Sequence, residues 1–330
     1  MTTDQTVSVE HDEGQTSHDQ PVAPEYETNG IKGIIRSPYV VGAAVLASFG
    51  GFSFGYDQGV ITLILTMPQF RGYYPEVSPD HPSYGFNTGF MTGMLELGAF
   101  LGCLFFPMLA DRYSRKWGLA IATVIFCVGA AIQTGAPNYA ALVAGRTIGG
   151  IGVGTLAMGS PLYISEVAPS NLRGSLLVLE AVTIVIGAII SYWITYGTRV
   201  IPSEWAFRLP FLLQMVPALV VGIGMQLFPF SPRWLAMRHR NEDSLKSLQK
   251  LRRLPATDHR VQMEWKGILN EVHLREQVLA RQYGTTSNIF IPELKQWGDL
   301  FRPKYLRRTF IALAIPFFQQ FSGRYCPTLS

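Results

Sequence analysis

Charged residues are scarce in this sequence and unevenly placed along it. Asp, Glu, Lys and Arg make up 15% of the 330 residues, whereas a soluble protein of this length would carry roughly 25%. Acidic side chains crowd residues 4–27, basic ones crowd the stretch after Ser231, and long apolar runs almost free of charge lie between them. This pattern excludes an ordinary soluble domain and indicates a protein that crosses a membrane several times.

Cysteine is equally scarce, with Cys103 and Cys127 inside apolar runs and Cys326 near the end. Three scattered cysteines make neither a disulfide framework nor a metal site, and none of the six histidines clusters with Cys or Asp at metal spacing. No nucleophile–base arrangement is visible, and a GxGxxG motif starting at Gly150 would need Gly where Thr155 stands. The sequence therefore argues against an enzyme and predicts no cofactor and no metal.

A basic surface for nucleic acid is missing as well. The formal net charge of +4 comes from Lys and Arg that sit just beyond apolar runs, where the positive-inside rule places them. The N-terminus is polar and acidic, the opposite of a secretory signal, and we expect residues 1–38 to form a disordered acidic cytoplasmic tail. The expected surroundings are a lipid bilayer and not nucleic acid.

Long apolar runs dominate the middle of the chain. A helix needs roughly 20 apolar residues to cross a bilayer, and six runs reach that length, while a seventh begins near residue 307. We therefore predict an all-α membrane protein with a six-helix transmembrane bundle over residues 39–230, a cytoplasmic linker over 231–306 and a truncated seventh transmembrane helix over 307–330. The six predicted spans are 39–63, 87–109, 117–136, 139–160, 174–197 and 208–230.

Lysine and arginine set the expected orientation of these spans. The loop after the second span holds three basic residues, and the stretch 233–308 holds sixteen against eight acidic ones. The loops on the opposite side hold only Arg71 and Arg199. By the positive-inside rule the N-terminus and the 2–3, 4–5 and 6–7 loops are cytoplasmic. The long 6–7 loop should contain two amphipathic helices, over 241–254 and 261–282.

Glycines recur at four-residue spacing inside the predicted spans. Such pairs let helix backbones approach closely in lipid, where burial of apolar surface gives little drive for association. We interpret most of them as packing positions. The pairs are Gly89 and Gly93, Gly98 and Gly102, and Gly150 and Gly154.

Five short motifs follow one another along the predicted spans. They are GYDQGVI at 55–61, LADRYSRKW at 109–117, AGRTIGGIGVGTLAMGSPLYISEVAPSNLRG at 144–174, FSPRWL at 230–235 and FFQQFSG at 317–323. In this order and spacing they resemble the signature motifs of sugar porters of the major facilitator superfamily, in wording closest to fungal members. Two positions depart from the usual pattern, because Ser114 stands where Gly is common and Phe230 where Glu is common.

The resemblance implies the major facilitator fold, in which twelve helices form two six-helix bundles with the sugar site between them. The sequence contains the N-terminal six-helix bundle, the cytoplasmic linker helices and an incomplete seventh transmembrane helix. After Gly323 the usual family text is replaced by Arg324, Tyr325 and Cys326. We therefore expect a C-terminally truncated chain, as a shortened or mis-spliced gene would produce.

Two of the charges inside the spans are expected to pair. Such charges are costly in lipid and need a partner or a water-filled cavity. The first span runs outward and the fourth inward, which puts Asp57 and Arg146 at similar depth. The resemblance implies that this acid and arginine are the proton-coupling pair. Facilitative members often carry Asn at the acid position, so Asp57 favours proton symport over facilitated diffusion. The alternative is a static ion pair that holds two helices together.

The other charges inside the spans are Glu96 and Glu180. Glu180 lies one position before Ala181, which matches the sugar-binding Gln of the family. Glu180 is thus either a substrate-binding residue or a structural partner of a neighbouring helix. Ile184, one turn beyond, should face the same way and matches an apolar lining position. We assign Glu96 a structural or pathway role, and a hexose, quinate and a disaccharide all stay open as substrates.

Gln319 and Gln320 lie side by side in the predicted seventh helix. Amide side chains donate and accept hydrogen bonds at once, which suits sugar hydroxyls. In an intact relative we expect both to contact the sugar.

Charged motifs on the predicted cytoplasmic side resemble the gating network that ties the two bundles together when the inner side is closed. Part of that network comes from the second half of an intact relative. Topology alone is the alternative explanation for Lys116 and its neighbour. The residues at the matching positions are Asp111, Arg112, Arg115, Glu166 and Arg173.

Two functions are therefore weighed for this chain. One is transmembrane transport of a monosaccharide by alternating access, coupled to protons and located in the plasma membrane. The other is a membrane sugar sensor or regulator that does not transport, or an inert fragment.

Overall fold

Six long apolar helices make up more than half of the residues that the structure describes. The computed structural model describes residues 38–283 and 298–319, so the predicted tail before Pro38, as well as Gln320, lies outside the described residues. Among the described residues, six helices are long and apolar enough to cross a membrane, and each overlaps one predicted span. The bounds are α2 (Pro38–Ile64), α4 (Tyr84–Arg112), α5 (Arg115–Gly135), α6 (Tyr139–Val167), α7 (Arg173–Thr198) and Trp205–Leu227.

The sixth span is interrupted, although its apolar pattern predicts one helix. It consists of α8 (Trp205–Leu213), α9 (Met215–Gly224) and the short 3-10 helix η2 (Met225–Leu227). Pro217 has no N–H to offer the carbonyl of Leu213, four residues earlier, and a proline ring at that place also crowds the preceding turn. The helix therefore breaks and restarts at Gln214.

Short polar side chains begin two of the long helices. Asn138 accepts a hydrogen bond from the N–H of Ala141 (2.8 Å) at the start of α6, and Ser114 accepts one from the N–H of Trp117 (3.2 Å) at the start of α5. Ser114 also has a φ of 141°, a conformation that glycine adopts far more readily than other residues. Glycine at this position of the family motif would relieve that strain, whereas serine supplies the cap instead.

The helices pack through glycines at specific points. A Cβ added at Gly98 would collide with the carbonyl oxygen of Thr147, and one added at Gly150 would collide with that of Leu95. The backbones of α4 and α6 therefore touch, as the spacing predicts. The same interpretation is wrong for Gly89, which has nothing within 4 Å of its Cβ position in the described part of the chain. Gly102 and Gly154 behave like Gly98, and Gly93 behaves like Gly89.

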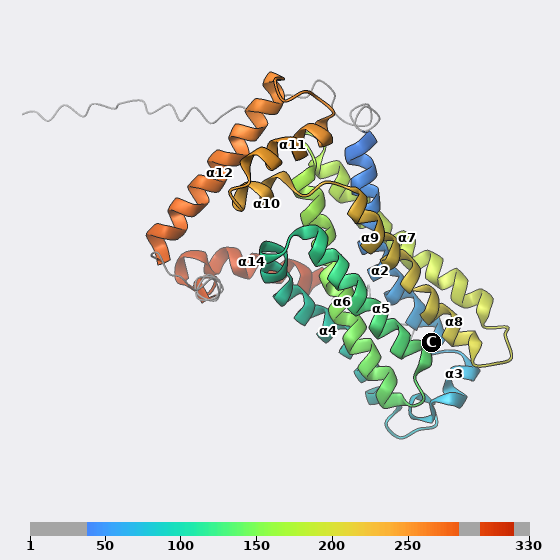
Figure 1. The fold of residues 1–330 in the computed structure, drawn as a ribbon. Helices are drawn as coiled ribbons and strands as arrows, with labels where there is room; N and C mark the ends of the chain where they lie inside the picture. Colours follow the sequence, from blue (N-terminus) through green and yellow to red (C-terminus); the bar gives the residue numbers. More distant parts are fainter. Residues whose placement is uncertain (1–37, 284–297, 320–330) are drawn as a thin grey trace, which may run out of the picture.

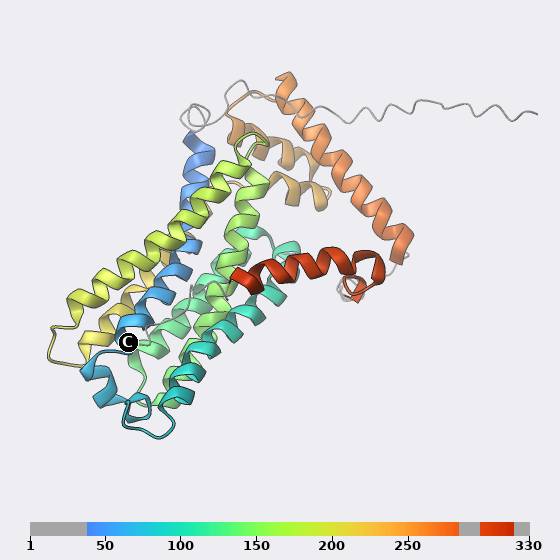
Figure 2. The same cartoon turned by 180° about the vertical axis from the view of Figure 1, so that it is seen from behind.

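Close backbone contact also joins α2 to α7. The Cβ position of Gly55 is filled by the carbonyl of Ile184, and that of Gly187 by the carbonyl of Phe52. Figures 1 and 2 show α2 (blue) and α7 (yellow-green) side by side along the bundle. The backbones of α2 and α7 therefore touch at these two points.

The ends of the bundle differ. At what we call the distal end, α3 (Pro68–Tyr73) lies beside α8 (Figure 1), and the 3-10 helix η1 (Pro75–Val77) lies against α3 and α4. The ring centroids of Phe70 and Phe207 are 5.3 Å apart. The Tyr74 hydroxyl donates to the carbonyl of Ala136 (2.9 Å), and burial raises the pKa of Tyr74 to about 12. An aromatic cluster thus closes this end.

The opposite end, which we call the linker end, carries three shorter helices. They are α10 (Pro232–Met237), α11 (Asn241–Arg252) and α12 (His259–Tyr283), and the last two match the predicted amphipathic stretches closely. Beyond them α14 (Pro303–Gln319) returns toward α4 and α6 without running alongside the six spans (Figures 1 and 2). With 17 residues, α14 is shorter than the six spanning helices.

Candidate functional site

A buried acid and a buried arginine face each other in the interior of the bundle. Asp57 on α2 and Arg146 on α6 are both fully shielded from solvent, and Oδ1 of the acid lies 3.7 Å from Nη1 of the arginine. Arg146 also donates from Nε to the carbonyl of Met91 on α4 (3.2 Å). One guanidinium therefore links three helices at the depth at which the topology predicts the two charges to meet.

This pair is loosely satisfied. Both carboxylate oxygens of Asp57 and both terminal nitrogens of Arg146 are buried without a hydrogen-bond partner among the described residues. Buried polar groups in proteins are nearly always hydrogen-bonded. Each exception therefore needs an explanation, and a functional role is one of them. The arrangement leaves Asp57 able to bind a proton without first giving up a hydrogen bond.

A second polar pair lies next to the first. Gln58 follows Asp57 on α2, and its Nε2 donates a hydrogen bond to Oε1 of Glu96 on α4. In contrast to the buried Asp57, Glu96 is exposed at the surface of the bundle. The sequence places Glu96 inside a span but contains no signal that identifies Gln58 as its partner.

Glu180 and Ile184 face the same way, as their spacing predicts. Both side chains point at Gly51 of α2, where an added Cβ would meet them. Glu180 is buried, with 7% of its surface exposed. One turn on, the Thr183 hydroxyl donates to the carbonyl of Ser48 (2.9 Å). These contacts place Glu180 in the α2–α7 interface.

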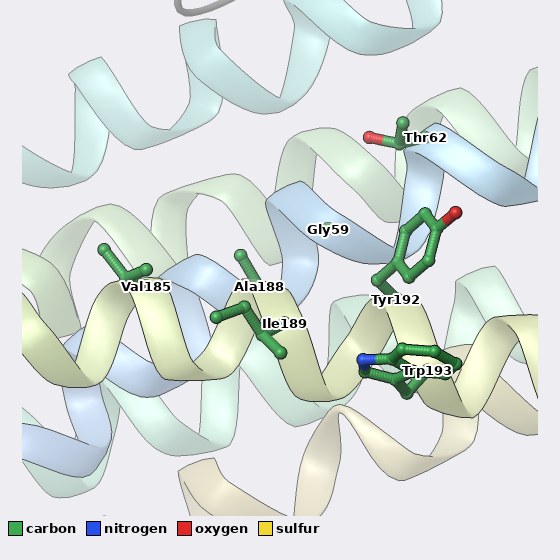
Figure 3. A pocket seen from close by; sticks show the side chains of 7 residues that line it. All are labelled: Gly59, Thr62, Val185, Ala188, Ile189, Tyr192 and Trp193. Carbon is green, nitrogen blue, oxygen red and sulfur yellow. The ribbon is translucent and has the colours of Figure 1, made fainter.

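A shallow groove runs between α2 and α7 nearer the distal end (Figure 3). Its volume is about 370 Å³, and its walls are apolar except for the hydroxyls of Thr62 and Tyr192. Tyr192 and Trp193 make a T-shaped ring contact with centroids 6.1 Å apart. These two aromatic residues are not among those predicted from the sequence, although an adjacent Tyr–Trp pair near the end of an apolar run is a visible signal. The lining residues are Gly59, Thr62, Val185, Ala188, Ile189, Tyr192 and Trp193.

An ion cluster holds the linker end of the bundle. Nη1 of Arg115 lies 2.8 Å from Oδ1 of Asp111, and Nη2 lies 2.8 Å from Oε1 of Glu166. Arg115 is buried between them, with 5% of its side chain exposed. Of the five residues assigned to a gating network, the structure brings these three together.

The other two assigned residues stand apart from this cluster. Arg112 is exposed, and its guanidinium lies 5.9 Å from the ring of Tyr113, while its carbonyl accepts a hydrogen bond from Arg238. Arg173 has no ion-pair partner among the described residues, and its Nε is buried without a hydrogen bond. Within the described residues, Asp111, Arg115 and Glu166 therefore contact one another, while Arg112 and Arg173 do not join them.

Lys116 has a local role that the sequence does not reveal. Its Nζ donates to the carbonyls of Gln226 (3.1 Å) and Phe228 (2.6 Å). The same ammonium lies 4.7 Å from the ring centroid of Phe230. Phe230 stands where the family motif commonly has Glu, and its ring provides a cation–π contact. Besides its contribution to topology, Lys116 thus closes the end of the sixth span.

Substitution of Arg115 should weaken the linker end. Arg115→Leu leaves Glu166 buried with no counter-charge, and we expect the free energy of unfolding to fall by roughly 3 kcal/mol. Arg112→Leu, at an exposed position three residues earlier, is the matched control and should change it by less than about 0.5 kcal/mol. Thermal unfolding of both variants in detergent, followed by far-UV circular dichroism, measures the difference. Equal effects would show that the buried cluster does not stabilise the bundle.

Six apolar helices with a buried acid–arginine pair and an ion cluster at one end define a membrane bundle of the major facilitator class. The solved structure of the proton:xylose symporter XylE aligns with a TM-score of 0.66 and 25% identity, over 76% of this chain and 55% of that one. The sequence model described as "Sugar (and other) transporter" matches residues 43–328. The chain belongs to this family, which is not a family of enzymes.

Two curated relatives show the range of roles among similar proteins. The high glucose sensor RGT2 of Saccharomyces cerevisiae is 34% identical, over 84% of this chain and 35% of its own length. The high-affinity glucose transporter of Kluyveromyces lactis is 31% identical, over 86% of this chain and 48% of its own length. The chain thus spans between about a third and a half of these relatives.

Proposed function

We propose that this chain supplies the first bundle of a proton-coupled monosaccharide transporter that works by alternating access. The observation that carries the proposal is the fully buried, loosely paired Asp57 and Arg146 between α2 and α6. An ionisable residue inside a membrane bundle marks an ion pathway more often than a structural contact. Family membership and the likeness to a proton:xylose symporter support the same function.

The coupling follows from the geometry of the pair. While Arg146 is near, its positive charge favours the ionised form of Asp57. If the bundles rock so that the two side chains separate, a carboxylate alone in a dry site is stabilised by binding a proton. Two conformations that differ in this pairing therefore differ in proton affinity, and the proton biases the equilibrium between them.

The sugar would bind at the groove between α2 and α7 of the same bundle. Thr62 and Tyr192 offer hydroxyls beside apolar walls in the α2–α7 groove, and aromatic surfaces with a few polar groups are typical of ligand sites. Glu180 and Ile184 lie on the same helix as Tyr192, packed against α2. Gln319 ends α14, and we propose that it and Gln320 complete the site in a chain with both bundles.

The orientation follows from the basic residues at the linker end. Since Lys and Arg concentrate on cytoplasmic loops, we propose that α10, α11 and α12 lie in the cytoplasm with the N-terminus. The gating role of Asp111, Arg115 and Glu166 fits this side, where their cluster would meet the second bundle. The expected location is the plasma membrane.

A sugar sensor is the second candidate. The observation that favours it is the 34% identity to a high glucose sensor. A sensor binds sugar without moving it, so it needs the substrate site but no proton cycle. Uptake measurements separate the two candidates.

Uptake of labelled sugars in a transporter-deficient yeast tests the proposal. Two forms are compared: this chain, and residues 1–302 of this chain followed by the second six-helix half of the K. lactis transporter, so that the seventh helix is not duplicated, each with and without Asp57→Asn. We expect only the longer form to transport. Asp57→Asn should abolish accumulation against a gradient and leave sugar exchange intact, because exchange needs no net proton movement.

Asp80→Asn is the control, since Asp80 is exposed in the loop before α4. It should leave accumulation unchanged. If the longer form reaches the membrane and moves no sugar, the transport proposal is wrong and the sensor is favoured. If Asp57→Asn accumulates sugar normally, proton coupling through this pair is wrong.

A further inference from the structure

Asp57 needs a proton route, because it is fully buried in this structure. Arg146 on α6 faces Asp57 from one side. Tyr56, the residue before Asp57, donates its hydroxyl hydrogen to the carbonyl of Pro210 at 3.3 Å. On the adjacent α7, the acid Glu180 lies at Gly51, more than one turn away along α2. None of these described groups connects Asp57 to solvent.

Glu96 on α4 lies between Asp57 and the surface of the bundle. Glu96 is exposed at the surface of the bundle, yet its carboxylate accepts a hydrogen bond from the side chain of Gln58, the residue next to Asp57. Glu96 also acts electrostatically on both Asp57 and Arg146. It is therefore the titratable side chain, among the described residues, that is both near the pair and exposed at the surface of the bundle.

The backbone around Glu96 is held in place. Leu95 presses its carbonyl onto Gly150 of α6, where no Cβ fits. Met91, just over one turn earlier, accepts the hydrogen bond from Nε of Arg146. These contacts fix the α4 backbone that carries Glu96 relative to the buried pair, and Gln58 holds its side chain, which keeps the distance that proton transfer requires.

We propose that Glu96 is the proton relay for Asp57, with Gln58 as the positioning residue that holds it. A proton from water binds a carboxylate oxygen of Glu96. It then passes through a bridging water molecule to an unpartnered oxygen of Asp57, so that Glu96 is ionised again and Asp57 becomes neutral. The reverse sequence releases the proton. This inference rests on the proposed proton coupling at Asp57.

Infrared spectroscopy of this chain in lipid nanodiscs tests the relay without requiring transport. The carbonyl stretch of a protonated carboxylic acid is followed after a rapid change of pH, and the band lost in Asp57→Asn belongs to Asp57. In Glu96→Gln we expect that band to reach the same amplitude at least tenfold more slowly. Glu96→Asp, which keeps an acid at the position, should recover most of the rate.

Glu242→Gln is the matched control, because Glu242 is exposed on α11 at the linker end. It should leave the rate unchanged. An unchanged rate in Glu96→Gln, with the Asp57 band present, would overturn the relay and leave the coupling proposal standing. Absence of any Asp57 band across the pH range would overturn both, so the two failures are distinguishable. A loss of amplitude that Glu96→Asp does not restore would show a structural role and also overturn the relay.

Discussion

Arg146→Leu should lower the free energy of unfolding of this chain by about 3 to 5 kcal/mol. The substitution removes a hydrogen bond to Met91 and strands Asp57 as a buried acid with no counter-charge. An isolated charge in a low-dielectric interior is far more costly than the pair it came from. The measurement is unfolding in mixed detergent micelles with increasing sodium dodecyl sulfate, followed by far-UV circular dichroism.

Two further variants separate charge from packing. Asp57→Leu combined with Arg146→Leu removes both charges and should recover most of the stability, since apolar replacements of a buried pair are often neutral. Asp57→Asn alone should cost less than Arg146→Leu, because Arg146 keeps the carbonyl of Met91 and lies near Glu96. A double variant as unstable as Arg146→Leu would show that the lost stability comes from packing and not from the stranded acid.

Gly98→Leu should prevent the normal packing of α4 on α6. The space that a side chain would need is occupied by the carbonyl of Thr147 and by the backbone of Gly150. Backbone atoms cannot move aside as a flexible side chain can, so we expect a loss of more than about 3 kcal/mol. The amount of monodisperse protein in fluorescence-detected size-exclusion chromatography should fall accordingly.

Gly89→Leu is the matched control on the same helix. Nothing lies within 4 Å of its Cβ position among the described residues, and the helix propensity of Leu exceeds that of Gly. This variant should be at least as stable as the original chain. If both variants lost stability equally, the helix contact at Gly98 would not be the cause.

The buried pair and the glycine contacts depend on the same packing of α4 against α6. Close backbone approach at Gly98 and Gly150 brings α4 against α6, and that approach lets Arg146 reach the carbonyl of Met91. The polar site thus depends on the apolar packing around it. A variant that separates the helices should disturb the proposed proton coupling even where it leaves every charged residue in place.

The sequence by itself determined where the membrane helices lie. The six spans follow from apolar length, which is a local property of the chain, and each predicted span overlaps a helix. Local rules also account for the two amphipathic helices of the linker, and topology predicts that Asp57 and Arg146 occur at one depth. The break at Gln214 was readable in principle from Pro217, but apolar length alone conceals it.

Only the tertiary structure decided which side chains meet. The same four-residue glycine spacing marks a backbone contact at Gly98 and open space at Gly89. Glu180 lies against α2, Lys116 binds two carbonyls, and Glu96 is held by Gln58. These outcomes depend on how each helix is rotated about its axis. That rotation is set by close packing between segments far apart in the sequence, so no local pattern contains it.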